Sequence, residues 1–370
     1  MTVTVQYWIM AWKRQKITTV VTAGVTSLHV RQPKASFLQP NYFILLRSAG
    51  TMEESLSLEL ATRAEPLLWI ETILCAIINV VALFGNLLSC YAVHRNQALR
   101  TLPNMFVVAL GVSDILMSVC CMPFSVVTLF RGEWIFGETF CRFVSFEVFT
   151  FGMASINTMA IIAVSRYFRV LKSVKYPVLF KKQRALVYIA VVWLLGFVGS
   201  APPLFFKKDA VKFQAGKATC WFSFQSNIAY TVFVECIYIA APLTFIVICY
   251  VKVFHTVSRS NRVFMQQNNP QQLRANFEEA KVTKTLAAVM VGFTCCWLPI
   301  CIVDNIDAAR GEDTLPRQVY LTYGFLCYLS STINPFIYVA TNKQFRREYK
   351  AILSNINCFG HQSSNWLFGA

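Results

Sequence analysis

The chain has 370 residues, of which 56% are hydrophobic and 14% charged, and its mean hydropathy is +0.49. This hydropathy exceeds that of soluble globular proteins, so the excess apolar surface must be buried in lipid. The formal net charge of +16 would suggest nucleic-acid binding in a soluble chain, but in a hydrophobic chain it indicates basic loops on an anionic cytoplasmic leaflet. We therefore expect an all-α membrane protein that does not bind nucleic acid.

Residues 1–65 precede the first long apolar run and contain no clear secretory signal and no Asn-x-Ser/Thr sequon. Met52 opens a short acidic stretch with Glu53 and Glu54. We interpret residues 1–65 as an extracellular N-terminal segment, in which the part before Met52 would be a gene-model extension.

Seven apolar runs follow. A helix needs about 20 apolar residues to cross about 30 Å of hydrocarbon. The candidate spans, which we expect to form a seven-helix bundle over residues 66–341, are Pro66–His94, Pro103–Phe130, Phe140–Val170, Leu186–Phe206, Ala229–Phe254, Val282–Asp304 and Val319–Thr341. No internal repeat is apparent, which disfavours a transporter built from duplicated halves.

Lys and Arg collect in alternate loops, and positively charged loops stay on the cytoplasmic side of a membrane. The basic segments are residues 95–100, 166–184, 252–284 and 345–350. The last is amphipathic and lies in the tail at residues 342–370, so we expect it to form a short eighth helix on the inner leaflet. One outer loop, residues 207–217, also holds four lysines, but the majority of basic segments places the N-terminus outside the plasma membrane.

Most of the 13 cysteines lie inside apolar runs without CxxC spacing, where they are small buried hydrophobic residues. Cys141 and Cys220 instead border predicted loops on one side of the membrane, and Cys358 follows the basic tail segment. The histidines are scattered over tails and span ends, so we expect no catalytic site and no enzyme.

Strongly polar residues are costly in hydrocarbon, so those inside spans are candidates for function, with interhelical hydrogen bonding as the plainer alternative. They are Asn86, Asp114, Asn157, Arg166, Glu235 and Asn334. Ordered motifs surround several of them, one in each of six spans: Gly85-Asn86, Leu110-Gly111-Val112-Ser113-Asp114, Trp193, Pro242 with Tyr250, Cys296-Trp297-Leu298-Pro299, and Asn334-Pro335-Phe336-Ile337-Tyr338.

From about Leu67 to Leu353, this ordered set resembles the rhodopsin-like G-protein-coupled receptors, nearest to the melatonin-receptor and opsin neighbourhood. The resemblance implies an extracellular ligand and a heterotrimeric G protein as partners, with arrestin and a receptor kinase. It also implies a disulfide between Cys141 and Cys220, which would persist outside the cell. By the same resemblance, Cys358 would be a lipidation site.

The resemblance assigns signalling roles to residues at the inner side. Ser165-Arg166-Tyr167 ends the third span, and Ser165 stands where the family usually has an acid that restrains the arginine. Glu279 matches the family position of a second restraint on Arg166; the alternative is a solvated charge in a loop.

Prolines that remove a backbone hydrogen bond would act as hinges. The resemblance implies that a ligand presses on Trp297, that Phe293 repacks, and that the sixth span swings outward at its inner end. Arg166, Tyr250 and Tyr338 would then line the G-protein cleft. Pro299, Asn334 and Pro335 complete the set of residues expected to act in activation and G-protein coupling. Asp114, Ser155, Ser331 and Asn334 resemble the family's sodium pocket, and all four offer hard oxygen donors.

The ligand is less clearly indicated. Val148 replaces the aspartate of aminergic receptors, and Tyr328 stands where opsins carry the retinal lysine, so we expect no retinal and no other cofactor. The pocket candidates are Val148, Phe149, Gly152, Tyr238, Trp297, Ile300, Cys301 and Tyr328. They describe an apolar, aromatic site for a small molecule of melatonin-like type. Glu147, Glu235 and Asp304 would add an acidic rim that suits a cationic or peptide ligand, so a peptide receptor remains an alternative, as does a multi-pass transporter.

Overall fold

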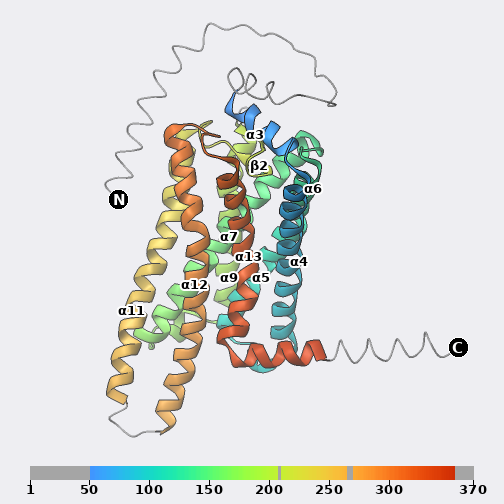
Figure 1. Cartoon of the computed structure of the whole chain (residues 1–370). Helices are drawn as coiled ribbons and strands as arrows, with labels where there is room; N and C mark the ends of the chain where they lie inside the picture. The colour runs from blue at the N-terminus through green and yellow to red at the C-terminus, as the bar shows by residue number, and fades with distance from the viewer. Residues whose placement is uncertain (1–50, 207–209, 265–269, 355–370) are drawn as a thin grey trace, which may run out of the picture.

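The computed structural model describes residues 51–206, 210–264 and 270–354, and the side chains within residues 258–282 are left out of the description. The long helices form one antiparallel bundle (Figure 1). They are α4 (Glu65–Arg95), α5 (Leu102–Cys120) with α6 (Met122–Arg131), α7 (Gly137–Leu171), α9 (Lys182–Ser200), α10 (Ile228–Phe233) with η5 (Val234–Ala240) and α11 (Ala241–Phe264), α12 (Pro270–Arg310) and α13 (Arg317–Thr341).

Shorter elements connect and cover the bundle. They are α3 (Met52–Ala61), η2 (Gln97–Leu99), α8 (Tyr176–Leu179), η3 (Pro202–Phe205), β1 (Val211–Gln214) and β2 (Thr219–Phe222). We call the end of the bundle that carries α3, β1 and β2 the disulfide end. A helix at residues 343–354 lies across the opposite end (Figure 1), which we call the terminal-helix end.

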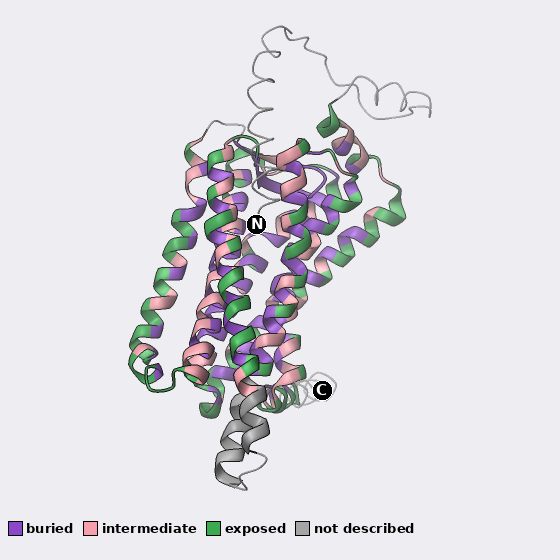
Figure 2. Cartoon of the chain, turned by 90° about the vertical axis from the view of Figure 1, so that its left-hand side faces the viewer, coloured by how far each residue is buried: buried purple, intermediate pink, exposed green. Residues whose placement is uncertain are grey.

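Six of the described helical segments are long and apolar enough to cross a membrane. Their outward faces carry exposed apolar side chains, such as Ile70, Phe84 and Val291, while buried residues face the interior (Figure 2). This inverted pattern is expected where lipid replaces water. The seventh helix, α13, is less apolar because it buries polar residues such as Arg317, Ser331 and Asn334 inside the bundle.

Three predicted spans are not continuous α-helices. The fourth ends as the α-helix α9 at Ser200 and is followed by the 3₁₀ segment η3, which begins at Pro202. The second breaks at Cys121, two residues before Pro123, which lacks the N–H that a continuous helix would use. The fifth contains the π-helical segment η5 just before Pro242. By contrast, α12 and α13 continue through Pro299 and Pro335.

The terminal helix is anchored by its apolar face. Phe345, Tyr349 and Ile352 are buried, and the Phe345 ring stacks on Tyr338 of α13 with 5.3 Å between centroids. The Tyr349 hydroxyl lies 2.5 Å from the Ser89 hydroxyl of α4. The predicted amphipathic eighth helix is therefore present.

The N-terminal segment holds a helix that the sequence did not indicate. Thr51 and Glu54 form a reciprocal capping box that begins α3, and Leu56 and Leu60 bury its inner face. The predicted gene-model extension before Met52 lies outside the described residues, apart from Thr51.

Candidate functional site

A disulfide joins Cys141, at the start of α7, to Cys220 in β2, as predicted. Strands β1 and β2 pair antiparallel, and the bond fixes this hairpin over the disulfide end of the bundle. Trp221 and Phe222, which directly follow Cys220, are 4% and 1% exposed. The hairpin therefore inserts its aromatic side chains into the bundle.

A cavity of about 30 Å³ lies beneath the hairpin. It is lined by Val148, Phe149, Met153, Ile156, Trp221, Phe224, Val234, Ile239, Trp297, Asp304 and Tyr323. Four of the predicted pocket residues line it: Val148, Phe149, Trp297 and Asp304. Sequence reasoning missed Trp221 and Phe224, although their position just after the disulfide cysteine was an available signal.

The other predicted pocket residues do not line this cavity. Gly152 packs against Trp297 so closely that an added Cβ would lie 3.1 Å from the indole ring. Ile300 is buried, and Cys301 is half-buried. Tyr238 packs against Gly199, where an added Cβ would lie 2.6 Å from the phenol ring.

Tyr328 points to the second span, where its hydroxyl lies 2.6 Å from the Ser125 hydroxyl. Glu235 lies in η5, and its Oε1 is buried without a hydrogen-bond partner among the described residues. Neither residue lines the cavity.

Trp297 and Phe293 form a stacked pair on α12, with 5.4 Å between ring centroids. Both rings are buried, and the pair extends from the cavity towards the middle of the bundle. A change at the cavity can therefore reach the packing of α12 against its neighbours directly.

Asp114 lies in the middle of the bundle and is 1% exposed. The Asn334 amide donates to its carboxylate at 2.8 Å, and the Ser155 hydroxyl lies 3.0 Å from that of Ser113. Asn334 Oδ1 is buried with no hydrogen-bond partner in the described part of the chain. This orphaned oxygen, with the carboxylate and hydroxyl groups, fits the donor set that a sodium ion requires.

Arg166 and Tyr338 line a cavity of about 880 Å³ at the terminal-helix end. Tyr250 is buried close enough to Arg166 to interact with it electrostatically. The structure thus brings together the three residues predicted for the G-protein cleft. The neighbouring Ser165 is buried, and its hydroxyl makes no hydrogen bond within the described residues.

Tyr167, the last residue of the motif, is half-buried, and the Lys252 ammonium lies 5.9 Å from its ring centroid. Glu279 falls within α12, but its side chain lies outside the description, so its predicted contact with Arg166 stays a prediction. Cys358 also lies outside the described residues.

A buried charge cluster at the disulfide end was missed by sequence reasoning. Glu71 of α4 accepts from Arg63 at 3.2 Å and from two nitrogens of Arg317 at the start of α13. The three side chains are at most 5% exposed. Burial lowers the pKa of the Arg63 guanidinium below its usual value. Such a cluster is costly to break, because buried charges would lose their partner, and Arg317 would keep only a longer pair, at 3.7 Å, with the 43% exposed Glu59.

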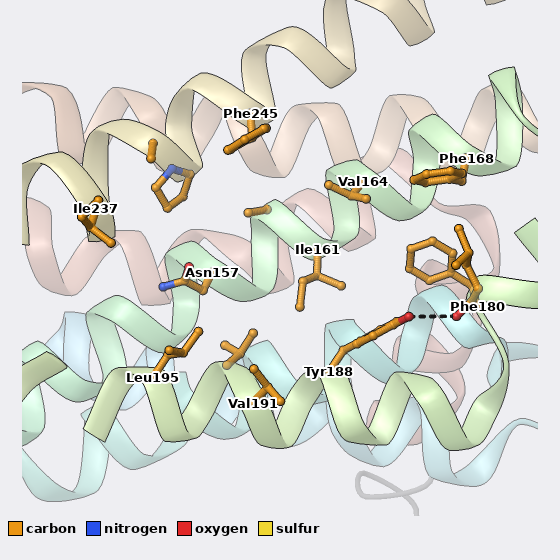
Figure 3. A pocket seen from close by; sticks show the side chains of 15 residues that line it. Asn157, Ile161, Val164, Phe168, Phe180, Tyr188, Val191, Leu195, Ile237 and Phe245 are labelled. Atoms are coloured by element: carbon orange, nitrogen blue, oxygen red, sulfur yellow. Dashed lines mark hydrogen bonds between the residues drawn. The ribbon is translucent and has the colours of Figure 1, made fainter. Parts of the chain in front are cut away.

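A wider groove of about 600 Å³ opens on the outer surface between α7, α9 and α11 (Figure 3). Its walls are apolar, apart from Asn157, whose amide donates to the Met153 carbonyl, and Tyr188, whose hydroxyl donates to the Leu179 carbonyl. No charged side chain lines it. It is a membrane-facing surface, separate from the aromatic cavity.

Comparisons with known proteins agree with this architecture. Residues 85–338 match the model of the family described as "7 transmembrane receptor (rhodopsin family)". The chain is 29% identical over 306 residues to melatonin receptor type 1A of Gallus gallus, covering 80% of this chain and 85% of the relative. It is 28% identical over 309 residues to melatonin receptor type 1B of Mus musculus, covering 81% and 84%.

The crystal structure of squid rhodopsin superimposes with a TM-score of 0.69 at 21% sequence identity, covering 79% of this chain and 87% of that chain. This likeness concerns the fold. The family match, with the disulfide-anchored hairpin at one end and the Arg166 cavity at the other, leaves the transporter alternative without support. The chain belongs to the rhodopsin family of seven-transmembrane receptors, which bind an extracellular ligand and activate heterotrimeric G proteins across the plasma membrane.

Proposed function

We propose that this receptor binds a small molecule with an aromatic body, of melatonin-like type, in the cavity under the hairpin. The observation that carries the proposal is the wall of Phe149, Trp221 and Trp297 around this cavity. An aromatic, mainly apolar wall with a few polar groups is typical of small-molecule sites. The names of the relatives, melatonin receptors, point to the same class of ligand.

In this proposal the disulfide end and the N-terminal segment of residues 1–65 face the outside of the plasma membrane. A disulfide persists in that oxidising compartment, and the basic segments then lie on the cytoplasmic side. Residues 66–341 form the receptor domain, and residues 342–370 form the cytoplasmic tail with Cys358 as a lipid attachment site.

The signal passes along α12. A ligand that presses on Trp297 shifts the stacked Phe293, and α12 pivots near Pro299 so that its inner end moves outward. Arg166 and Tyr338 already line a cavity at that end, into which the G protein inserts. Arrestin and a receptor kinase act on the same face. To activate the receptor, the ligand needs only to bind the open state more tightly than the closed state.

A sodium ion would be held by Asp114, Ser155, Ser331 and Asn334, where it would supply positive charge that favours the closed arrangement. The proposal is supported by the buried Asn334 carbonyl oxygen, which lacks a partner among the described residues, and by the bond from Asn334 to Asp114 that bridges α13 to α5. The receptor works as a signal transducer with no catalytic step. It holds no covalent retinal, since Tyr328 provides no amine for a Schiff base.

The proposal is tested by a small-molecule library, including melatonin and related indoles, with nucleotide exchange on G proteins as the readout in transfected cells. We expect an aromatic small molecule to activate the receptor, and Gly152→Leu to abolish this response at unchanged surface expression. The reason is that Gly152 lies against Trp297, so a leucine there would displace the indole. Activation by peptides alone would contradict the proposal.

A further inference from the structure

Two carboxylates beside the aromatic cavity have oxygen atoms without partners. Asp304 of α12 lines the cavity and is 5% exposed, and its Oδ1 makes no hydrogen bond within the described residues. Glu235 of η5 lies close enough to interact with Asp304 electrostatically, and its Oε1 is likewise buried without a partner. The Tyr323 hydroxyl lies near the Asp304 carboxyl group, but each of the two carboxyl groups keeps one buried oxygen without a partner among the described residues. Such oxygens are costly to bury, so the pair favours a positively charged group beside it.

The positive charge already present does not balance this cluster. Lys217, from the turn of the hairpin, is 3% exposed, and its ammonium lies 4.0 Å from the Asp307 carboxylate. Asp307 also accepts from the Tyr320 hydroxyl at 2.5 Å, whereas Lys217 reaches Asp304 only as an electrostatic attraction. Asp304 and Asp307 thus share the ammonium of Lys217, and Glu235 adds a further carboxyl group beside Asp304. Glu312, which also acts on Asp304 and Asp307, pairs with Lys212 at 3.5 Å.

Lys217 shows that this compartment suits an ammonium group. Its Nζ lies 4.3 Å from the ring centroid of Tyr323 and 5.5 Å from that of Trp221. The rings of Tyr320 and Phe224 lie 5.8 and 5.9 Å away. Aromatic faces attract cations in this range, and cages of such rings recognise ammonium ligands. The space beside Asp304 therefore has neighbours that already stabilise one organic cation.

A metal ion fits this place less well. The described residues contain no group of three or more His, Cys, Asp or Glu side chains arranged to hold a metal. The cavity of about 30 Å³ accepts a group of the size of a water molecule, and an ammonium head has that size. The hairpin must shift outward to admit the rest of a ligand.

We propose that the ligand of this receptor is an aromatic amine whose ammonium group binds between the Asp304 and Glu235 carboxylates, with its aromatic body packed against Trp297 and Trp221. This inference rests on the proposed small-molecule function and names the chemistry of its ligand. Aminergic receptors hold the amine with an aspartate at the α7 position where this chain has Val148. In this receptor the carboxylates that bind the amine lie instead on α12 and η5. The site then holds a second ammonium beside the one that Lys217 supplies.

The test uses purified full-length receptor in lipid nanodiscs and matched pairs of probes: tryptamine with N-acetyltryptamine, and 2-phenylethylamine with its N-acetyl derivative. The members of a pair share the aromatic body and differ in charge. We expect each amine to bind at least about tenfold more tightly than its neutral amide, because loss of a buried charge pair costs more than 1.4 kcal/mol.

The isosteric variants Asp304→Asn and Glu235→Gln should weaken amine binding by at least about tenfold and leave amide binding within about twofold. Glu133→Gln is the matched control, since Glu133 is an exposed carboxylate in the loop after α6. It should change neither affinity. Equal or tighter binding of the amides, or amine binding that both variants leave intact, overturns the inference.

A second measurement needs no ligand. Neutralising Asp304 removes its repulsion with Glu235 in the empty receptor, and Lys217 keeps its partner Asp307, so Asp304→Asn should raise the melting temperature by roughly 2 °C or more. A fall in melting temperature for both variants would mean that the carboxylates hold the fold together, and this overturns the inference.

The experiments distinguish failure of the cationic-ligand inference from failure of the proposed small-molecule function. If the amides bind and the amines do not, the cationic ligand is wrong and the small-molecule function stands. If neither class binds, the cationic ligand is again wrong, and the small-molecule function falls only when the wider library also yields no activator.

Discussion

The charge cluster of Glu71, Arg63 and Arg317 allows a stability prediction of defined size. Glu71→Gln removes the carboxylate that both guanidinium groups share and leaves two positive charges at most 2% exposed, of which Arg317 keeps a pair at 3.7 Å with the 43% exposed Glu59. Removing one partner of a buried ion pair costs about 3–5 kcal/mol. At about 2 °C per kcal/mol, the lower end of the usual range, the melting temperature should fall by about 6–10 °C.

The assay is thermal unfolding of purified receptor in nanodiscs, followed by a thiol-reactive dye that reports exposure of buried cysteines such as Cys75. Glu138→Gln is the control, since Glu138 also sits at the disulfide end and pairs with Arg142 at 3.5 Å, but its side chain is 61% exposed. Exposed pairs contribute about 0–1 kcal/mol, so this variant should unfold within about 2 °C of the native receptor.

A rescue variant separates charge from packing. Glu71→Leu combined with Arg63→Met and Arg317→Met replaces the whole cluster by apolar side chains, which is often neutral or stabilising. It should regain most of the lost stability. If Glu71→Gln unfolds at the native temperature, the cluster does not join α4 to α13 in the way the geometry implies.

Three further outcomes are expected. Cys220→Ser should abolish surface expression or ligand response, since it frees the hairpin, and non-reducing peptide mapping that finds free thiols in functional receptor would contradict the bridge. Ser165→Asp should lower ligand-free nucleotide exchange several-fold, because a charged partner for Arg166 stabilises the closed state by on the order of 1 kcal/mol more than a neutral one. Glu279→Ala should raise ligand-free nucleotide exchange at matched expression. Unchanged exchange in both would mean that Arg166 is restrained elsewhere. Receptor incubated with retinal should show no visible Schiff-base absorbance, since Tyr328 carries no amine, and a borohydride-trapped adduct would refute this.

Local sequence properties predicted the main architecture. Hydropathy located the helices because crossing a membrane requires a minimum length of apolar chain, whatever the neighbouring helices are. The positions of Cys141 and Cys220 in ordered motifs predicted the bridge that the structure contains. The same motifs predicted that Arg166 and Tyr338 would lie together at one end of the bundle.

Helix geometry was only partly predictable. The break at Cys121 and the π-helical segment before Pro242 depend on how the freed backbone groups find partners, which a single apolar run does not reveal. The seventh span was predicted as an apolar run, although α13 is not among the six helical segments that are long and apolar enough to cross a membrane. Several of its polar side chains find partners on neighbouring helices, as when Asn334 donates to Asp114.

The sequence by itself therefore determined the seven-helix class, the receptor family and the disulfide, since these follow from local composition and ordered motifs. Only the tertiary structure decided what closes the cavity and what charges it contains. Glu71 and Arg317 meet across 246 residues of chain, and Trp221 and Trp297 line one cavity because the disulfide-linked hairpin lies over the bundle. Such contacts depend on the relative positions of whole helices, so no local pattern encodes them. The same is true of Asp304 and Glu235, whose neighbouring carboxylates make the site acidic.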